Sequence, residues 1–206
     1  MRRNFLFLLM LNFLPELLLS QQNAEFKKVK NHFESQKSQI LMAFKREFVT
    51  KTDPFEKEQM HQEFVDFMKK MDSVQNSAYI GTLVKVKNNE DLGKLHHLEV
   101  NQNDFYDGNA LTKSPEYPGG LNELRRQIAD VFFAETVLPM QKQYNTRVSF
   151  VVEKDGSIST VEAVGENHPF NIQAMIAVYL LPDKFSPAML SDRPVKYRFT
   201  LPLILN

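Results

Sequence analysis

The chain has 206 residues, with 25 basic and 25 acidic side chains, a formal net charge of +0 and an apolar fraction of 43%. This length accommodates one average domain or two small ones, and the apolar fraction is typical of a globular protein rather than a disordered one. The balanced charge argues against the basic surface on which nucleic-acid binding depends. Because cysteine is absent, the chain forms no disulfide and no thiolate metal site, and it carries no acylated N-terminal cysteine.

Residues 1–20 have the pattern of an export signal. Two arginines precede a short apolar stretch, which Pro15 and Glu16 interrupt before a polar segment begins. A membrane-spanning helix needs about 20 apolar residues, so we predict a cleaved signal peptide. The rest of the chain is then expected in the periplasm. The alternative is an uncleaved segment that anchors the protein in the inner membrane.

Residues 21–81 predict an amphipathic helical hairpin, since apolar side chains recur there at steps of three, four or seven. Asp53 has the character of an N-cap and Pro54 suits a first helical position, so a second helix is expected to start there. We expect that helix to run to about Tyr79 and to be broken by Gly81. Its apolar and methionine side chains either close on the first helix or offer an adaptable surface to a partner.

Residues 82–113 predict a linker between the hairpin and the C-terminal part. A run of asparagine, aspartate and glycine between 101 and 109 is typical of turns. Residues 83–86 fit either a short strand or the last turn of the preceding helix.

Residues 114–206 predict an α+β domain with a small antiparallel sheet and two helices. The first helix follows Gly120, and two alternating segments then flank Asp155-Gly156, a pair that tolerates the positive φ of a tight turn. A second helix starts at His168-Pro169, and the last strand alternates most regularly. The predicted order is helix, strand, strand, helix, strand.

Several short motifs occur in this part in a fixed order. They run Pro115-Glu116-Tyr117-Pro118-Gly119-Gly120, then Val148 to Ile158, then Phe185-Ser186-Pro187-Ala188, and finally Pro194-Val195 leading to Phe199-Thr200-Leu201-Pro202. In this order and spacing, residues 115–204 resemble the TonB C-terminal domain in the form common among Bacteroidetes. The motif residues on which the resemblance depends most are Tyr117, Pro118, Gly119, Gly120, Asp155, Gly156 and Pro187.

The resemblance implies a periplasmic domain that binds a short peptide segment of outer-membrane TonB-dependent receptors and so supports transmembrane transport as an energy transducer. The mechanism it implies is β-augmentation, in which an extended peptide pairs with a free sheet edge. The charged residues of the strand expected to offer that edge also keep an exposed edge soluble, which is a simpler interpretation. The expected peptide-binding residues are Val195, Lys196, Tyr197, Arg198, Phe199, Thr200 and Leu201.

The chain also departs from the family. Family transducers engage inner-membrane motor proteins through an uncleaved N-terminal helix and cross the periplasm on a proline-rich spacer. Here the start is signal-like, a helical hairpin follows, and no such spacer is present, so motor proteins are expected partners only if the N-terminus is retained. The alternative function is a non-energised envelope scaffold that binds protein partners through this fold and the hairpin. Whether the protein forms a homodimer stays open.

No constellation in the sequence predicts an active site, a metal or a cofactor. His96 and His97 are adjacent, so in a strand they would point to opposite faces. The turn-rich run from Asp104 to Asn109 places Phe105 and Tyr106 where calcium ligands would be needed. The sequence also has no phosphate-binding glycine loop and no nucleophile elbow. We therefore expect a binding protein rather than an enzyme.

Overall fold

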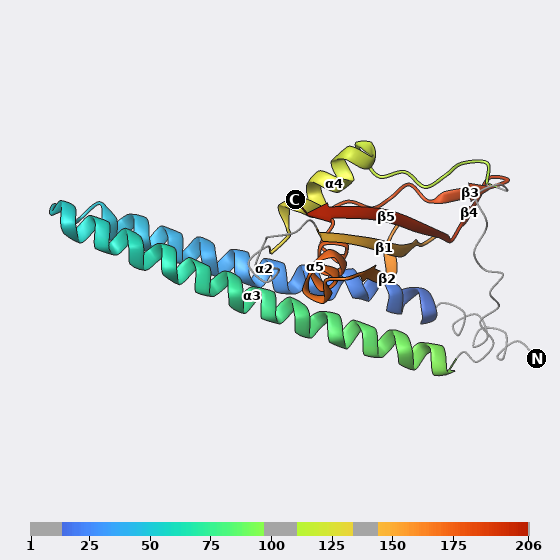
Figure 1. Cartoon of the computed structure of the whole chain (residues 1–206), viewed down its shortest axis with the longest axis horizontal. Helices are drawn as coiled ribbons and strands as arrows, with labels where there is room; N and C mark the ends of the chain where they lie inside the picture. Colours follow the sequence, from blue (N-terminus) through green and yellow to red (C-terminus); the bar gives the residue numbers. More distant parts are fainter. Residues whose placement is uncertain (1–13, 97–110, 134–143, 206) are drawn as a thin grey trace, which may run out of the picture. The chain divides into compact units, whose positions relative to one another are not determined.

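The computed structural model describes residues 14–96, 111–133 and 144–205 (Figure 1). The chain divides into two compact units: Glu25–Val84, and Lys85–Asn206 together with Met1–Ala24. Most of the expected export signal lies outside the described residues, although its last part already belongs to the first helix, which begins at Leu14. No helix in the described ranges has both the length and the apolar character of a membrane span.

The expected helical hairpin consists of α2 (Leu14–Phe48) and α3 (Pro54–His96). The first unit holds its larger part, and the start of α2 and the end of α3 from Lys85 on belong to the second unit. Asp53 caps α3 as predicted, because its carboxylate accepts a hydrogen bond from the Phe55 amide at 3.1 Å. The helices pack through aromatic pairs, of which Phe44 and Phe64 stack with ring centroids 4.1 Å apart. Lys37 lies between these helices and binds both Asp72 and Gln75, and such a polar contact fixes the register of two packed helices.

The prediction that α3 ends near Gly81 is wrong, as is the assignment of residues 82–96 to a linker. The helix continues to His96. A glycine inside a helix costs only about 1 kcal/mol relative to alanine, and the buried Leu83 and Val86 continue the apolar spacing on the same helix. Of the rest of the predicted linker, residues 97–110 lie outside the described part, and Lys113 pairs with Met189 in an isolated β-bridge.

The second unit has an α+β fold whose sheet is antiparallel. Strands β1 (Tyr144–Val152), β2 (Ile158–Gly165) and β5 (Tyr197–Leu205) form a three-stranded sheet in the order β2-β1-β5. Helix α5 (His168–Tyr179) packs against β2 and β1, and α4 (Gly120–Asp130) contacts α5. Both predicted helices and the antiparallel sheet are thus confirmed (Figure 1).

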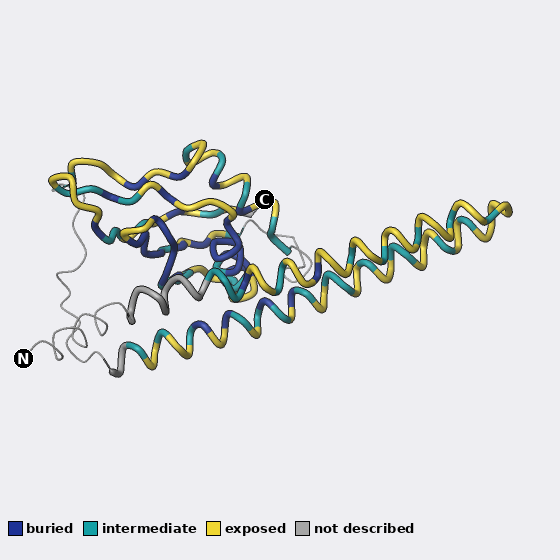
Figure 2. Tube along the Cα trace, turned by 180° about the vertical axis from the view of Figure 1, so that it is seen from behind, coloured by how far each residue is buried: buried dark blue, intermediate teal, exposed yellow. Residues whose placement is uncertain are grey.

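One face of the sheet forms the core with α5. Buried residues concentrate in this unit along the strands and α5, whereas burial alternates along the hairpin (Figure 2). On β1 the side chains that face α5 are the even-numbered ones, as the alternation predicted. The largest fully buried side chains of the unit are Leu124, Val148, Phe150, Val152, Val161, Gln173, Ile176, Val178, Tyr179 and Leu201.

The alternation predicted for β2 is interrupted at Thr160. The pairing register shifts between Ser149 and Val151, so that two residues of β2, Thr160 and Val161, lie opposite one residue of β1. This is a β-bulge, and Thr160 adopts a φ of 51°, an uncommon conformation for a β-branched residue. As a result Val161, rather than Thr160, lies on the buried face.

The last predicted strand, 195–201, is split at Lys196. Val195 belongs to β4 (Arg193–Val195), which pairs with β3 (Ala188–Leu190) in a separate two-stranded sheet. Ser191 and Asp192 form the turn between these strands, and both adopt positive φ, as a tight hairpin requires. The strand β5 then begins at Tyr197.

Two glycines with positive φ can be compared in a test of the turn between β1 and β2. Gly156 lies in this turn, and Gly120 lies at the start of α4. Gly156 and Gly120 have φ values of 79° and 77°, and an alanine at either position costs about 1–2 kcal/mol through this conformation alone. A Cβ on Gly156 would also lie 1.9 Å from the Phe185 carbonyl oxygen, whereas a Cβ on Gly120 meets nothing within 4 Å. We expect Gly156→Ala to lower the free energy of unfolding clearly more than Gly120→Ala, measured by urea denaturation. Equal losses would show that the Phe185 carbonyl moves aside freely.

Candidate functional site

The backbone of β2 reveals which of its residues face away from β1. The Val161 N–H donates to the Tyr179 hydroxyl at 3.3 Å, and the Gly165 carbonyl accepts from the Asn171 side chain at 2.9 Å. Both partners belong to α5 rather than to β1. The N–H and C=O of one residue in a strand point to the same side, and this side alternates from residue to residue. In this stretch of β2 the backbone groups of the odd-numbered residues therefore point away from β1, and those of Glu162 and Val164 point towards it.

The same alternation carries across the sheet to β5. Glu162 pairs with Ser149, so the backbone groups of the odd-numbered residues of β1 point to β2 and those of the even-numbered residues point to β5. Val148 pairs with Leu201, and therefore the backbone groups of the odd-numbered residues of β5 point to β1. Thr200 and the other even-numbered residues point their backbone groups to the far edge. Pro202 agrees with this assignment, because a proline has no N–H to give and is found on the outer side of edge strands.

The two edges of the sheet differ in what covers them. On β2, the Thr160 amide donates to the Glu90 carboxylate at 3.1 Å, and the same oxygen accepts from Tyr179 at 3.0 Å. The Glu90 side chain is only 5% exposed and is neutralised by Lys87 at 2.7 Å. On β5, in contrast, no strand pairs with the outer edge within the described ranges. The outer edge of β5 is thus the sheet edge that has no pairing strand in the described part of the chain.

The side chains of β5 give its two faces different chemistry. Tyr197 and Phe199 are half-buried on the core side, and Leu201 is fully buried there. On the opposite face, Lys196 pairs with Glu153 at 3.1 Å and Arg198 with Glu162 at 3.7 Å. These cross-strand pairs hold the charged side chains of the strand over the sheet, in line with the predicted alternation.

Phe185 supports β5 from beneath. Its ring lies 5.5 Å from that of Phe199, 5.6 Å from Phe150 and 4.9 Å from Tyr117. Aromatic rings at these separations attract one another in addition to the area that they bury. The Phe185 amide also donates to the Gly156 carbonyl at 3.0 Å. In the sequence Phe185 appears only as part of a short motif, and its central position becomes clear only in three dimensions.

The motif residues of the predicted site lie around Phe185 and not on the open edge. Tyr117 contacts its ring, Gly156 binds its backbone, and Pro187 follows two residues later beside β3. Gly119 and Gly120 turn the chain into α4, with the Gly120 amide donating to the Tyr117 carbonyl at 2.8 Å. The motif thus builds the support for β5, while the backbone of β5 itself forms the candidate site.

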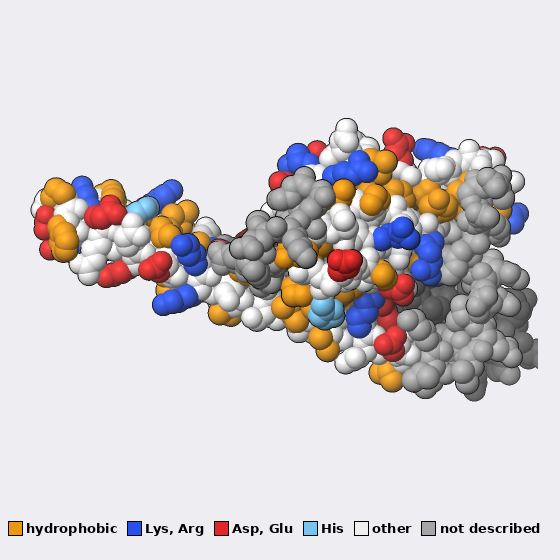
Figure 3. Space-filling view, in the orientation of Figure 1, with side chains coloured by type: hydrophobic (Ala, Val, Ile, Leu, Met, Phe, Trp, Pro, Cys, Tyr) orange, Lys and Arg blue, Asp and Glu red, His pale blue; other side chains and the backbone are white. Residues whose placement is uncertain are grey.

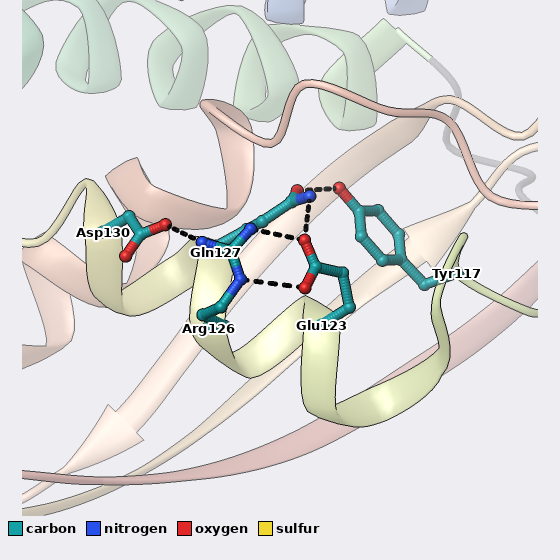
Figure 4. Close-up of polar contacts among 5 residues, drawn as sticks. All are labelled: Tyr117, Glu123, Arg126, Gln127 and Asp130. Carbon is teal, nitrogen blue, oxygen red and sulfur yellow. Dashed lines mark hydrogen bonds and ion pairs between the residues drawn. The ribbon is translucent and has the colours of Figure 1, made fainter.

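Tyr117 is anchored to α4 by a polar network (Figure 4). Its ring is 2% exposed, and its hydroxyl donates to Gln127 at 2.5 Å. Burial raises the pKa of Tyr117 to about 12. Gln127 in turn donates to Glu123 at 2.8 Å. Hydrogen bonds from Arg126 and then Gln127 lower the pKa of Glu123 to about 2, so the carboxylate stays charged at neutral pH.

The charge of Asp155 at the β1–β2 turn makes stability pH-dependent. Partial burial acts to raise its pKa, but hydrogen bonds from Lys184 and Ser157 outweigh burial and lower the pKa to about 2. A carboxyl whose pKa is lowered by folding stabilises the protein above its unfolded pKa of about 4 and loses this effect as the pH falls towards 2. Because the pair is exposed, the contribution is expected below about 1 kcal/mol.

We therefore expect Asp155→Asn to be less stable than the natural protein at pH 6, with a gap that shrinks between about pH 4 and pH 2. Urea midpoints at several pH values measure this gap. The matched variant Lys184→Met removes the partner instead and should show the same pH window. A gap that is constant with pH would contradict the role of the charge.

The described residues contain no group of histidine, aspartate and glutamate side chains that could hold a metal ion. No family model, curated protein or solved structure matches the chain. The likeness to the TonB C-terminal domain therefore depends on the motifs quoted above, and the candidate site depends on the geometry of β5.

Proposed function

We propose that this protein is a periplasmic TonB-like protein that binds extended peptide segments of outer-membrane transporters by β-augmentation along β5, and so supports TonB-dependent transport. The observation that carries the proposal is the contrast between the two sheet edges. The edge of β2 is occupied by Glu90 and Tyr179, whereas the edge-facing backbone of β5 has no strand beside it among the described residues.

The chemistry of β5 suits an extended peptide. Thr200 offers both an N–H and a C=O to the edge, and backbone hydrogen bonds of this kind provide affinity with little dependence on sequence. Half-buried Tyr197 and Phe199 would contact the apolar side chains that alternate on one face of an added strand. The salt-bridged Lys196 and Arg198 lie on the other face, where an added strand would place its polar side chains.

The edge also has a defined end. At Pro202 the added strand finds a carbonyl acceptor but no donor, so pairing is weaker beyond this residue. We infer that the peptide pairs mainly alongside residues 197–201, the stretch of β5 that precedes this proline.

Substitution of Thr200 tests the proposal. Thr200→Pro removes one edge-facing N–H while keeping a residue that edge strands tolerate, and Thr200→Val removes only the hydroxyl. With synthetic peptides that span the N-terminal segments of outer-membrane transporters from the same genome, we expect Thr200→Pro to weaken binding about tenfold or more. Thr200→Val should bind within about twofold of the natural protein, because its backbone donor remains. Calorimetric titration measures both, and circular dichroism checks that each variant is folded.

A substitution at Pro202 has the opposite effect on the edge, because it adds a backbone donor. Pro202→Val supplies the missing edge-facing N–H, and one further hydrogen bond should tighten peptide binding about two- to tenfold. If Thr200→Pro and Thr200→Val bound the peptides equally well, strand addition at β5 would be excluded. A Pro202→Val variant without effect would show that the paired stretch ends before residue 202.

A further inference from the structure

Helix α3 carries an apolar row that is exposed at Phe67 and Val74 and partly exposed at Met60. Met60, Phe67 and Val74 recur every seven residues, and Phe67 and Val74 remain 46% and 57% exposed. Phe64 and Gln75, which contact α2, lie about 60° to 100° around the helix from Phe67 and Val74. Apolar residues at a seven-residue repeat are typical of a helix that packs against another helix.

Charged residues flank this row in a self-complementary pattern. Glu63 precedes Phe67 by four residues and Lys70 follows it by three. Both are exposed, and Lys70 forms no ion pair with any described residue. If two copies of α3 lie antiparallel with Phe67 facing its own copy, Met60 of each copy meets Val74 of the other. Glu63 of each copy then lies within one residue of the level of Lys70 of the other, close enough for these long side chains to pair on either side of the central Phe67 contact.

We propose that the protein forms a homodimer through α3, with the Met60–Phe67–Val74 row of each copy packed antiparallel on that of the other. A twofold axis requires that the same surface be complementary to itself, and the pairing of Glu63 with Lys70 satisfies this condition. Hydrophobic and charged side chains lie interspersed along the hairpin (Figure 3), as such a mixed interface requires. The contact involves few turns of helix, so we expect a weak dimer, as is typical of small interfaces.

This dimer is independent of peptide binding by β5. It uses residues of the hairpin unit only, and its tests require no peptide. Failure of the dimer would leave the proposed function untouched, and the reverse also holds.

Cysteine cross-linking tests the twofold axis directly. Since the chain has no cysteine, Phe67→Cys in the full-length protein can form a disulfide only with a second copy, and the two introduced thiols would lie face to face. We expect a disulfide-linked dimer on oxidation with copper phenanthroline. The matched variant Ser73→Cys places an exposed thiol elsewhere on the same helix and should remain monomeric. Equal cross-linking of the two variants would overturn the proposal.

Charge reversal tests the pairing without removing apolar contacts. Glu63→Lys alone and Lys70→Glu alone each turn two attractions into two repulsions, and we expect either change to weaken dimerisation roughly tenfold. The double variant Glu63→Lys/Lys70→Glu restores opposite charges and should regain dimerisation. Sedimentation equilibrium measures the dissociation constants, and helical content by circular dichroism confirms folding. A double variant no better than the single ones, or a natural protein that is monomeric at millimolar concentration, would refute the arrangement.

Discussion

The organisation of the C-terminal unit depends on the need to satisfy backbone hydrogen bonds at the two edges of a three-stranded sheet. A buried N–H or C=O without a partner is costly, so edges are either covered by other groups or left to solvent. Here the edge of β2 is covered by side chains from α5 and from the last turns of α3. The edge of β5 is not covered by a strand in the described part of the chain. The bulge at Thr160 adds to this asymmetry, because the amide of Thr160 donates to Glu90.

The open edge is held firmly in spite of its position. Phe185 lies under Phe199 and Phe150, and Tyr117 packs on Phe185 from the segment that precedes α4. The motif residues therefore act at a distance from the edge, through the ring that they position. This explains how residues from three separate parts of the sequence can belong to one site although none of them reaches the backbone that would bind a ligand.

The sequence predicted the elements of the C-terminal unit well, because each has a strong local signal. Alternation in β1 and the Asp155-Gly156 turn are properties of neighbouring residues, and the structure confirms them. The end of α3 was mispredicted because Gly81 breaks helices on average, whereas tertiary contacts of Glu90 extend this one. Long-range contacts of this kind leave no periodic trace in the sequence. The same holds for the bulge at Thr160, and for the role of Pro202, whose meaning depends on which way its neighbours face.

The occupied edge of β2 has a further consequence for self-association. A sheet with two open edges can add copies of itself at both ends and grow into a fibre without limit. A sheet with one open edge can pair only once, and two copies joined edge to edge through β5 would leave β2 of each copy outside, where Glu90 and Tyr179 already bond its amides. Association through this sheet therefore ends at two copies. A sheet with one open edge is in this way kept from polymerising through its strands.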